Sequence, residues 1–413
     1  MNLEYFIAKR LSSGKGHKNS ISAPIIKIAI AAITISIVMM LIAIATGGGL
    51  KKKIREKIAA FNGHIQISTF DNNRSDVSVS PIYLEQDFYP EFKNVSGIQH
   101  VQAVASKGGI VRTEETVEGI LAKGVGQDYN WSVFEEFIVA GRVPNFLEDR
   151  SDEVLISRLL SNKLKLKLGD TFMSIFLRDN DPSKMPNQQK STIVGIYDSG
   201  FEEFDATYVF MDIRHIQRMN KWEDNQIGNF EIFIDDFDAI DEKSLEISGK
   251  TFSLLQTTTI KDKFSFIFQW LDLFDFNTAL IIGIMILVGG INMITALLVL
   301  ILERTTMIGI LKALGANDWS VRKIFLYNAA YLISIGLFLG NFIGLGIIWA
   351  QDKYRMFKFP NPKEYYIEYI PVHISVTAIV ALNIGVMILC LLMLIIPSYI
   401  ITKITPVKAI KFD

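Results

Sequence analysis

Residues 279–302 read ALIIGIMILVGGINMITALLVLIL and contain no Asp, Glu, Lys, Arg or His. An α-helix rises about 1.5 Å per residue, so a stretch of this length extends over roughly 35 Å, enough to cross the hydrocarbon core of a bilayer. Buried helices of soluble proteins rarely stay uncharged beyond about 18 residues. The stretch therefore predicts a transmembrane helix.

Three further stretches have the same apolar character and predict transmembrane helices at residues 25–46, 324–350 and 374–399. A cleaved signal peptide is the alternative for the first, because Ala43-Ile44-Ala45 imitates a cleavage site. However, its apolar stretch is longer than the usual core of about 7–15 residues, and about 24 residues precede it. We therefore expect an uncleaved membrane anchor.

The long segment between the first two predicted helices has the composition of a soluble domain. Gly63-His64-Ile65-Gln66-Ile67-Ser68 alternates with period two, which predicts a strand, and helical patterns such as Glu153–Lys163 lie between strand-like segments. We therefore expect a membrane protein with four transmembrane α-helices and a large α+β domain between helices one and two. The expected parts are an N-terminal segment (1–24), the first helix (25–46), the large domain with helical stalks (47–278), the second helix (279–302), a loop (303–323), the third helix (324–350), a loop (351–373), the fourth helix (374–399) and a tail (400–413).

The composition excludes several classes of protein. Of 413 residues, 50% are hydrophobic, which excludes disorder, and the single Cys390 excludes a disulfide scaffold. The net charge of −1 lacks the excess of basic residues that is typical of nucleic-acid-binding proteins. Five His and one Cys leave little material for a structural zinc site, so we expect no metal.

Basic residues flank the predicted helices about equally on both sides, so the positive-inside rule leaves the orientation almost open. The N-terminal segment and residues 51–57 carry similar numbers of Lys and Arg, and so do the loops at 303–323 and 351–373. Only the tail, with Lys403, Lys408 and Lys411, favours cytoplasmic termini.

The last three predicted helices contain no Asp, Glu, Lys, Arg or His, which argues against an ion-coupled transporter, since such transporters hold ions or protons within the membrane. The third helix carries Gly336, Gly340 and Gly344. Spacing by four places these glycines on one face and lets another helix approach closely. The partner helix is either in the same subunit or in a second one.

Motifs for catalysis are missing from the sequence. Ser248-Gly249-Lys250-Thr251 resembles the end of a phosphate-binding loop, but Ser244 stands where the loop requires its first Gly. No Gly-x-Ser-x-Gly or His-Glu-x-x-His motif is present. We therefore expect no catalytic residue, no cofactor of its own and no ATP hydrolysis by this chain.

The loop after the second predicted helix reads ERTTMIGILKALGA at residues 303–316. The spacing of Ile308, Leu311 and Leu314 predicts a short amphipathic helix with these residues on one face, and Gly315 ends it. The string resembles the ER-x-x-EIG-x-L-[KR]-A-[LM]-G element of four-span ABC permeases, which include FtsX, MacB and the lipoprotein-releasing Lol permeases. Met307 stands where that family usually has Glu.

In that family this element is the coupling helix that docks on the ATPase subunit. The resemblance implies a docking role for Glu303, Arg304, Ile308, Gly309, Leu311, Lys312, Ala313, Leu314 and Gly315. It also implies that a separate ABC ATPase dimer binds ATP and Mg²⁺.

Segments throughout the chain are similar to the Lol branch of these permeases. They are Phe6–Arg10, Gly48–Ile65, Leu121–Val125, Ala140–Arg142, Val154–Ser157, Leu168–Asp170, Gly195–Asp205 and Pro406–Lys411. The resemblance implies a bacterial inner-membrane protein with cytoplasmic termini, a cytoplasmic loop at 303–323 and a MacB-like periplasmic domain.

A polar segment with two prolines lies between strand-like Thr171–Leu177 and Ser191–Ile196, which predicts an exposed hairpin. In Lol permeases of the LolC type, the corresponding place holds a hook that recruits the periplasmic lipoprotein chaperone. The resemblance thus implies a hook, for which the candidate residues are Arg178, Asp181, Pro182, Met185 and Pro186. The alternative is a hairpin tip without a partner.

The resemblance implies a permease subunit that extracts lipoproteins from the inner membrane and delivers them to a periplasmic chaperone. A second permease chain is expected, as a homodimer or a heterodimer. Two alternatives share the coupling helix: MacB-like export of peptides or toxins, and FtsX-like signalling that activates a periplasmic hydrolase without moving a substrate.

Overall fold

The computed structural model describes residues 3–12, 22–72, 76–113, 116–146, 150–177, 185–360 and 367–404. The chain divides into two compact units. We call residues 1–52, 270–358 and 369–413 the membrane unit, and residues 53–269 and 359–368 the sheet unit. Each unit contains its own hydrophobic core.

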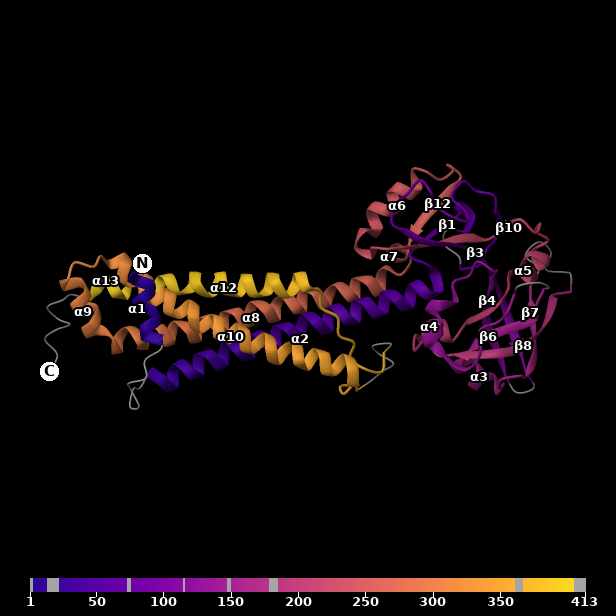
Figure 1. The fold of residues 1–413 in the computed structure, drawn as a ribbon. Helices are drawn as coiled ribbons and strands as arrows, with labels where there is room; N and C mark the ends of the chain where they lie inside the picture. The colour runs from indigo at the N-terminus through magenta and orange to yellow at the C-terminus, as the bar shows by residue number, and fades with distance from the viewer. Residues whose placement is uncertain are drawn as a thin grey trace. The chain divides into compact units, whose positions relative to one another are not determined.

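Helices build the membrane unit (Figure 1). They are α1 (Leu3–Ser12), α2 (Ser22–Asn62), α8 (Ser265–Glu303), α9 (Thr305–Ala313), α10 (Asp318–Tyr354), α12 (Val376–Ser398) and α13 (Ile400–Lys403). Four helical segments are long and apolar enough to cross a membrane, at Pro24–Asn62, Ser265–Glu303, Asp318–Tyr354 and Val376–Lys403. The expectation of four transmembrane helices is confirmed.

Helices α2 and α8 continue well beyond their apolar stretches, and each contributes residues to both units. The polar end of α2 reads LKKKIREKIAAFN, and Ile54 and Ile58, four residues apart, are fully buried. Spacing by four gives this part of the helix one apolar face. The helix therefore continues to Asn62 although the sequence has lost its membrane-like composition.

The core of the membrane unit combines side chains from all four long helices. Ile37 of α2, Ile301 of α8 and Phe325 of α10 are fully buried there, and so is Leu394 of α12. Outward-facing positions such as Phe342 stay apolar. Helices with apolar side chains on every face are typical of a bilayer environment.

Asn341 of α10 and Asn383 of α12 form a reciprocal amide pair within this core region. Asn341 Nδ2 donates to Asn383 Oδ1 at 2.6 Å, and Asn383 Nδ2 donates to Asn341 Oδ1 at 3.1 Å. Each amide also donates to a carbonyl one turn earlier in its own helix. The pair links α10 to α12 by polar contacts between apolar helices.

A mixed sheet dominates the sheet unit. Its strands are β1 (Ile65–Thr69), β3 (Ile98–Arg112), β4 (Val117–Val125), β5 (Ile138–Gly141), β6 (Glu153–Ser157), β7 (Thr171–Phe176), β8 (Asn187–Tyr197), β9 (Tyr208–Asp212), β11 (Asn229–Ile234) and β12 (Leu255–Thr259). Their order is β12-β1-β11-β3-β4-β9-β6-β8-β5, and β7 pairs with β3 and β8. The short strands β2 (Ile82–Tyr83) and β10 (Gln226–Ile227) pair with each other.

Short helices accompany the sheet. They are α3 (Arg158–Leu164), α4 (Glu202–Asp205), α5 (Ile213–Asn220), α6 (Ile240–Ser248) and α7 (Ile260–Lys263), with 3-10 turns η1 (Phe70–Asn72), η2 (Trp131–Val133), η3 (Glu135–Phe137) and η4 (Phe237–Ala239). Leu160 of α3 and Ile216 of α5 pack into the core formed by β3, β4, β6 and β9. The predicted α+β domain is confirmed.

Candidate functional site

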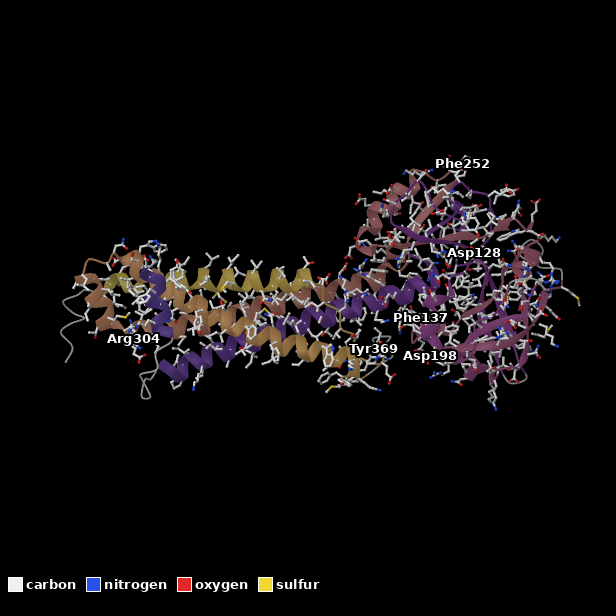
Figure 2. All side chains as sticks on the ribbon, viewed as in Figure 1. Asp128, Phe137, Asp198, Phe252, Arg304 and Tyr369 are labelled. Carbon is white, nitrogen blue, oxygen red and sulfur yellow. The ribbon has the colours of Figure 1, made fainter. Side chains whose placement is uncertain are left out.

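Helix α9 connects α8 to α10 and is the candidate coupling element. Arg304 precedes its first residue, and Figure 2 shows Arg304 at the end of the helices of the membrane unit. Leu314 caps the C-terminus of α9, and Gly315 follows with φ of 92°. This φ value favours glycine, which has no Cβ to clash with the backbone. The sequence therefore ends the helix sharply at this point.

One side of α9 packs into the membrane unit. Ile308 and Gly309 are buried, and Leu311 packs against the same core. The prediction that Leu314 shares this face is wrong, because six residues turn a helix of 3.6 residues per turn to about 120° short of two full turns, which moves Leu314 away from Ile308. As a result, Leu314 is 80% exposed.

The opposite side of α9 is open. We call Thr306, Ile310, Ala313 and Leu314 the α9 outer face, since all four are exposed. Ile310 is 49% exposed, and it precedes Leu314 by four residues, which places the two apolar side chains next to each other. The outer face therefore offers an apolar contact that the rest of the described chain does not cover.

Lys312 points into its own chain. Its Nζ donates to the carbonyl oxygens of Ile401 at 2.7 Å and Ile404 at 2.8 Å, and it pairs with Asp318 Oδ1 at 2.8 Å. The Ile401 carbonyl belongs to α13 and the Ile404 carbonyl follows the end of that helix, where a cation is favourable. Lys312 thus attaches α9 to the chain beyond α12.

Arg322 of α10 makes a second attachment at the same end. Its Nε donates to Ser398 Oγ at 3.0 Å and its Nη2 donates to the Ile395 carbonyl at 3.0 Å. The guanidinium also lies over the Trp319 ring at 5.3 Å. Sequence reasoning missed Arg322, Asp318 and Ser398, because contacts such as that between Arg322 and Ser398, 76 residues apart, have no local sequence pattern.

The other two predicted docking residues lie at the junction of α8 and α9. Glu303 is exposed at the last position of α8, and Arg304 is half-buried before α9. Apart from the half-buried Arg304, the nine predicted residues therefore separate into two groups of four. Ile308, Gly309, Leu311 and Lys312 face their own chain, whereas Glu303, Ala313, Leu314 and Gly315 are exposed.

The predicted hairpin corresponds to β7 and β8, which pair antiparallel from Thr171–Thr192 to Phe176–Asn187. Of the hook candidates, Arg178, Asp181 and Pro182 lie outside the described residues. Met185 and Pro186 immediately precede β8, and both are exposed. The described part of the hairpin thus places an accessible methionine next to the candidate tip.

The glycine stripe of α10 faces α2 of the same chain. A Cβ atom placed on Gly336 would lie 2.6 Å from Ile33 Cγ2, and one placed on Gly344 would lie 2.8 Å from Leu41 Cδ1. Gly340 makes a similar approach between them. The helix that packs against these glycines is therefore α2 of the same chain, which is the first of the two alternatives for the partner helix.

The Gly200–Asp205 segment has a structural role in the sheet unit. Asp205 Oδ1 accepts from Ser199 Oγ at 2.6 Å, and Asp205 Oδ2 accepts from Gly200 N at 3.1 Å. Burial raises the pKa of Asp205 to about 6, against the effect of the Ser199 hydrogen bonds. Phe204 stacks on Phe61 with ring centroids 4.6 Å apart. These contacts attach the segment to the end of α2.

Comparison with known protein families identifies the class. The model of the MacB-like periplasmic core domain matches residues 28–244, and the model of the FtsX-like permease C-terminal region matches residues 279–406. Together with the four membrane-spanning helices, these matches define a multi-pass ABC transporter permease. The chain belongs to the family of FtsX-like permeases that carry a MacB-like periplasmic core domain, as its resemblance to them predicts.

Individual relatives align over the full chain, nearly the full chain or a part of it. The lipoprotein-releasing system transmembrane protein LolE of Haemophilus influenzae is 19% identical and aligns over 99% of each chain. The corresponding LolC protein of Neisseria meningitidis is 20% identical over 100% of each chain. The macrolide export protein MacB of Rhodopirellula baltica is 31% identical, over 24% of this chain and 14% of its own.

Two of the solved structures that are similar to part of the chain are isolated domains. The extracellular domain of the ABC-type transporter YknZ matches with a TM-score of 0.31 and 16% identity, and it covers 48% of this chain and 100% of its own. The periplasmic region of MacB from Actinobacillus actinomycetemcomitans also has a TM-score of 0.31 and 16% identity, with 47% and 87% covered.

Proposed function

We propose that this permease extracts lipoproteins from the bacterial inner membrane and passes them to a periplasmic chaperone. The observation that carries the proposal is the full-length similarity to proteins named for lipoprotein release. Similarity to the macrolide exporter covers only 24% of the chain. In this proposal the termini and α9 are cytoplasmic, and the sheet unit is periplasmic.

The composition of the membrane helices fits a substrate held by lipid. The apolar segments of α8, α10 and α12 carry no Asp, Glu, Lys, Arg or His in residues 279–302, 324–350 and 376–398. Transporters of ions or charged solutes need such groups within the membrane. The acyl chains of a lipoprotein are already in the bilayer, so a permease for them does not require a charged site.

Energy comes from a separate ATPase dimer that binds ATP and Mg²⁺, and the α9 outer face is the surface that docks on it. An apolar pair such as Ile310 and Leu314 at the centre of an interface is typical of a strong contact. Lys312 attaches α9 to α13, and Arg322 attaches α10 to the end of α12. Closure of the ATPase dimer would therefore displace these helices together.

The docking role is tested by Ile310→Glu, which places a charge on the outer face. We expect the ATPase to be lost from the purified complex while the permease still accumulates in membranes. Leu245→Glu, which changes an exposed apolar residue of α6, is the matched control and should leave co-purification intact. Gly309 is less suitable because it is buried, so a carboxylate there would also disturb the fold.

The transport role is tested by reconstituting the permease and its ATPase in proteoliposomes. We expect transfer of an acylated lipoprotein to the soluble chaperone that depends on ATP. ATP turnover without any transfer would contradict the proposal and would favour the signalling alternative. Transfer of a soluble peptide or toxin in place of the lipoprotein would favour MacB-like export.

A second permease chain is part of the proposal. Leu273, Leu280 and Leu287 of α8 are all about half exposed and seven residues apart, a spacing that suits packing against another helix. The test is oxidation of Leu280→Cys in membranes, since the native Cys390 is buried. A cross-linked dimer is expected for Leu280→Cys, and none for the exposed Ile396→Cys on α12. Cross-linking with a different chain would identify a heterodimer.

A further inference from the structure

Helix α10 carries an exposed tryptophan near each of its ends. Trp319 is the second residue of the helix, at the end that adjoins α9, and Trp349 lies near the other end. The helix is continuous between them, so at 1.5 Å per residue the two positions are about 45 Å apart along its axis. A bilayer with its headgroup layers is about 40–45 Å thick, and tryptophan is enriched in these layers. The two rings therefore mark the two headgroup layers.

Two cations gather at the Trp319 ring. The guanidinium carbon of Arg322 lies 5.3 Å from the ring centroid, and Lys323 Nζ lies 5.8 Å from it. The same guanidinium carbon lies 5.9 Å from the centroid of Tyr399, an exposed ring that caps the end of α12. Cation–π contacts of this length hold a cation in place without neutralising its charge. We call Trp319, Arg322, Lys323 and Tyr399 the headgroup cluster.

The two cations form no ion pair with the carboxylates of the described residues. The neighbouring Asp318 pairs with Lys312 at 2.8 Å instead. Arg322 donates to two uncharged oxygen atoms of α12, and Lys323 makes no hydrogen bond within the described part of the chain. Like charges close to each other repel, so an anion from outside the chain would stabilise this arrangement.

The other end of α10 provides a comparison with a different balance of charge. Lys353 follows Trp349 by four residues, as Lys323 follows Trp319, and its Nζ lies 5.2 Å from the Trp349 centroid. However, the exposed carboxylate of Asp352 directly precedes this lysine. Among the described residues, Lys353 is also the single cation over the Trp349 ring. The excess of positive charge at a tryptophan is therefore specific to the α9 end.

We propose that the headgroup cluster binds the phosphate group of an anionic phospholipid such as phosphatidylglycerol, in the leaflet at the α9 end. Basic pockets between transmembrane helices are suited to anionic headgroups. Lys323 pairs with the phosphate, while Arg322 holds the two rings in place. Tyr331 and Phe338 are exposed and follow Lys323 by 8 and 15 residues, which places them on the same side of α10, along the acyl chains.

This lipid site is additional to the proposed lipoprotein transport and does not depend on it. It requires the membrane-spanning helices and an accessible Lys323, which is half-buried. A phosphatidylcholine headgroup has the same phosphate but balances it with its own ammonium group. The charge of Lys323 therefore predicts selectivity for the anionic lipid.

The test measures lipid binding to the full-length permease in a neutral detergent by native mass spectrometry. Phosphatidylglycerol is titrated against phosphatidylcholine with the same acyl chains, and sodium phosphate is added in a separate arm to distinguish a lipid from free phosphate. Lys323→Gln removes the charge and Lys323→Arg keeps it. Lys353→Gln is the matched control, since it removes the corresponding lysine at the other end of the same helix.

We expect the native permease to bind phosphatidylglycerol at least about fivefold more tightly than phosphatidylcholine, the contribution of one cation near a membrane surface. Lys323→Gln should lose this preference, whereas Lys323→Arg and Lys353→Gln should keep it. Melting temperatures without lipid should be equal, because Lys323 makes no hydrogen bond within the described chain.

The proposal is overturned if the native permease binds the two lipids equally, or if Lys323→Gln keeps the preference. An equally large loss in Lys353→Gln would also overturn it, because the effect would then be one of overall charge. Displacement of the lipid by sodium phosphate at matched ionic strength would show a site for free phosphate instead. Loss of the ATPase from purified Lys323→Gln, with lipid binding unchanged, would assign the cluster to the ATPase contact.

Discussion

Gly340 of α10 lies so close to Ile37 of α2 that a Cβ atom added to the glycine would be 2.6 Å from Ile37 Cβ. Carbon atoms in favourable contact are about 3.5–4.0 Å apart. Gly336 and Gly344 make similar approaches on either side, each within 2.8 Å of an α2 side chain. The lack of a Cβ atom at these three glycines therefore allows the two helices to approach this closely.

Replacing Gly340 by alanine should destabilise the membrane unit. The added methyl group must displace Ile37 or separate the helices, and overpacking of this kind costs about 1–3 kcal/mol. Thermal unfolding of the purified permease in detergent measures the effect. Gly346→Ala on the same helix is the control, since nothing lies within 4 Å of that Cβ position. Equal melting temperatures for the two variants would contradict the packing argument.

His64 should make the stability of the sheet unit depend on pH. Burial lowers the pKa of His64 from 6.5 to about 4, and its Nδ1 accepts the backbone N–H of Ile234 at 3.0 Å. In the unfolded chain the ring protonates near pH 6.5, so the folded state binds fewer protons between pH 6.5 and 4. Stability is therefore full above about pH 6.5 and falls as the pH drops toward 4, by on the order of 2 kcal/mol.

The variant His64→Asn separates this effect from general acid denaturation. Asn Oδ1 takes the place of Nδ1 as an acceptor for the Ile234 N–H, but it does not titrate. Unfolding followed by tryptophan fluorescence between pH 7 and pH 4 should show a smaller loss of stability in the variant. A loss as large as in the native chain would rule out His64 as its source.

Lys312→Met should weaken the attachment of α9 to α13. The ammonium group donates to the carbonyls of Ile401 and Ile404, and hydrogen bonds to charged groups contribute about 1.5–3 kcal/mol. We expect a lower melting temperature and weaker coupling of ATP turnover to transport, with the ATPase still bound through the α9 outer face. Lys403→Met, at an exposed position of α13, should change neither quantity.

The buried Lys123–Glu231 pair should show strong coupling in a double-mutant cycle. Lys123→Met leaves a carboxylate without its cation in a buried site, and such a change costs about 3–5 kcal/mol. Adding Glu231→Gln removes that charge and should recover part of the loss. Unfolding in urea gives the four stabilities that the cycle requires. Additive losses would show that the two side chains do not interact.

The four membrane helices are predictable because a long uncharged stretch has few other stable environments. The polar continuation of α2 to Asn62 is less visible, since its buried face consists of residues spaced by four within a lysine-rich segment. Leu314 lies outside the predicted face because two successive steps of three residues turn it about 120° away from Ile308, next to Ile310.

The contacts of α9 and the burial of the polar side of β1 cannot be predicted from local sequence patterns. Lys312 reaches carbonyls about 90 residues away, and any residue can supply a carbonyl, so no side chain marks the partner. The alternation of Gln66 and Ser68 with Ile65 and Ile67 predicts β1 correctly, but it suggests that the polar side faces water. Only the three-dimensional arrangement shows that Ser68, on this side, is buried.

The reciprocal amide pair between Asn341 and Asn383 has a mechanical consequence. Sliding α10 past α12 by one turn, about 5.4 Å, would separate two amides in surroundings that offer no water to replace their hydrogen bonds. The hydrogen bond from Arg322 to Ser398 connects the same two helices near their other end. With two polar contacts along their length, α10 and α12 resist sliding past each other, so a displacement of one of these helices should also move the other.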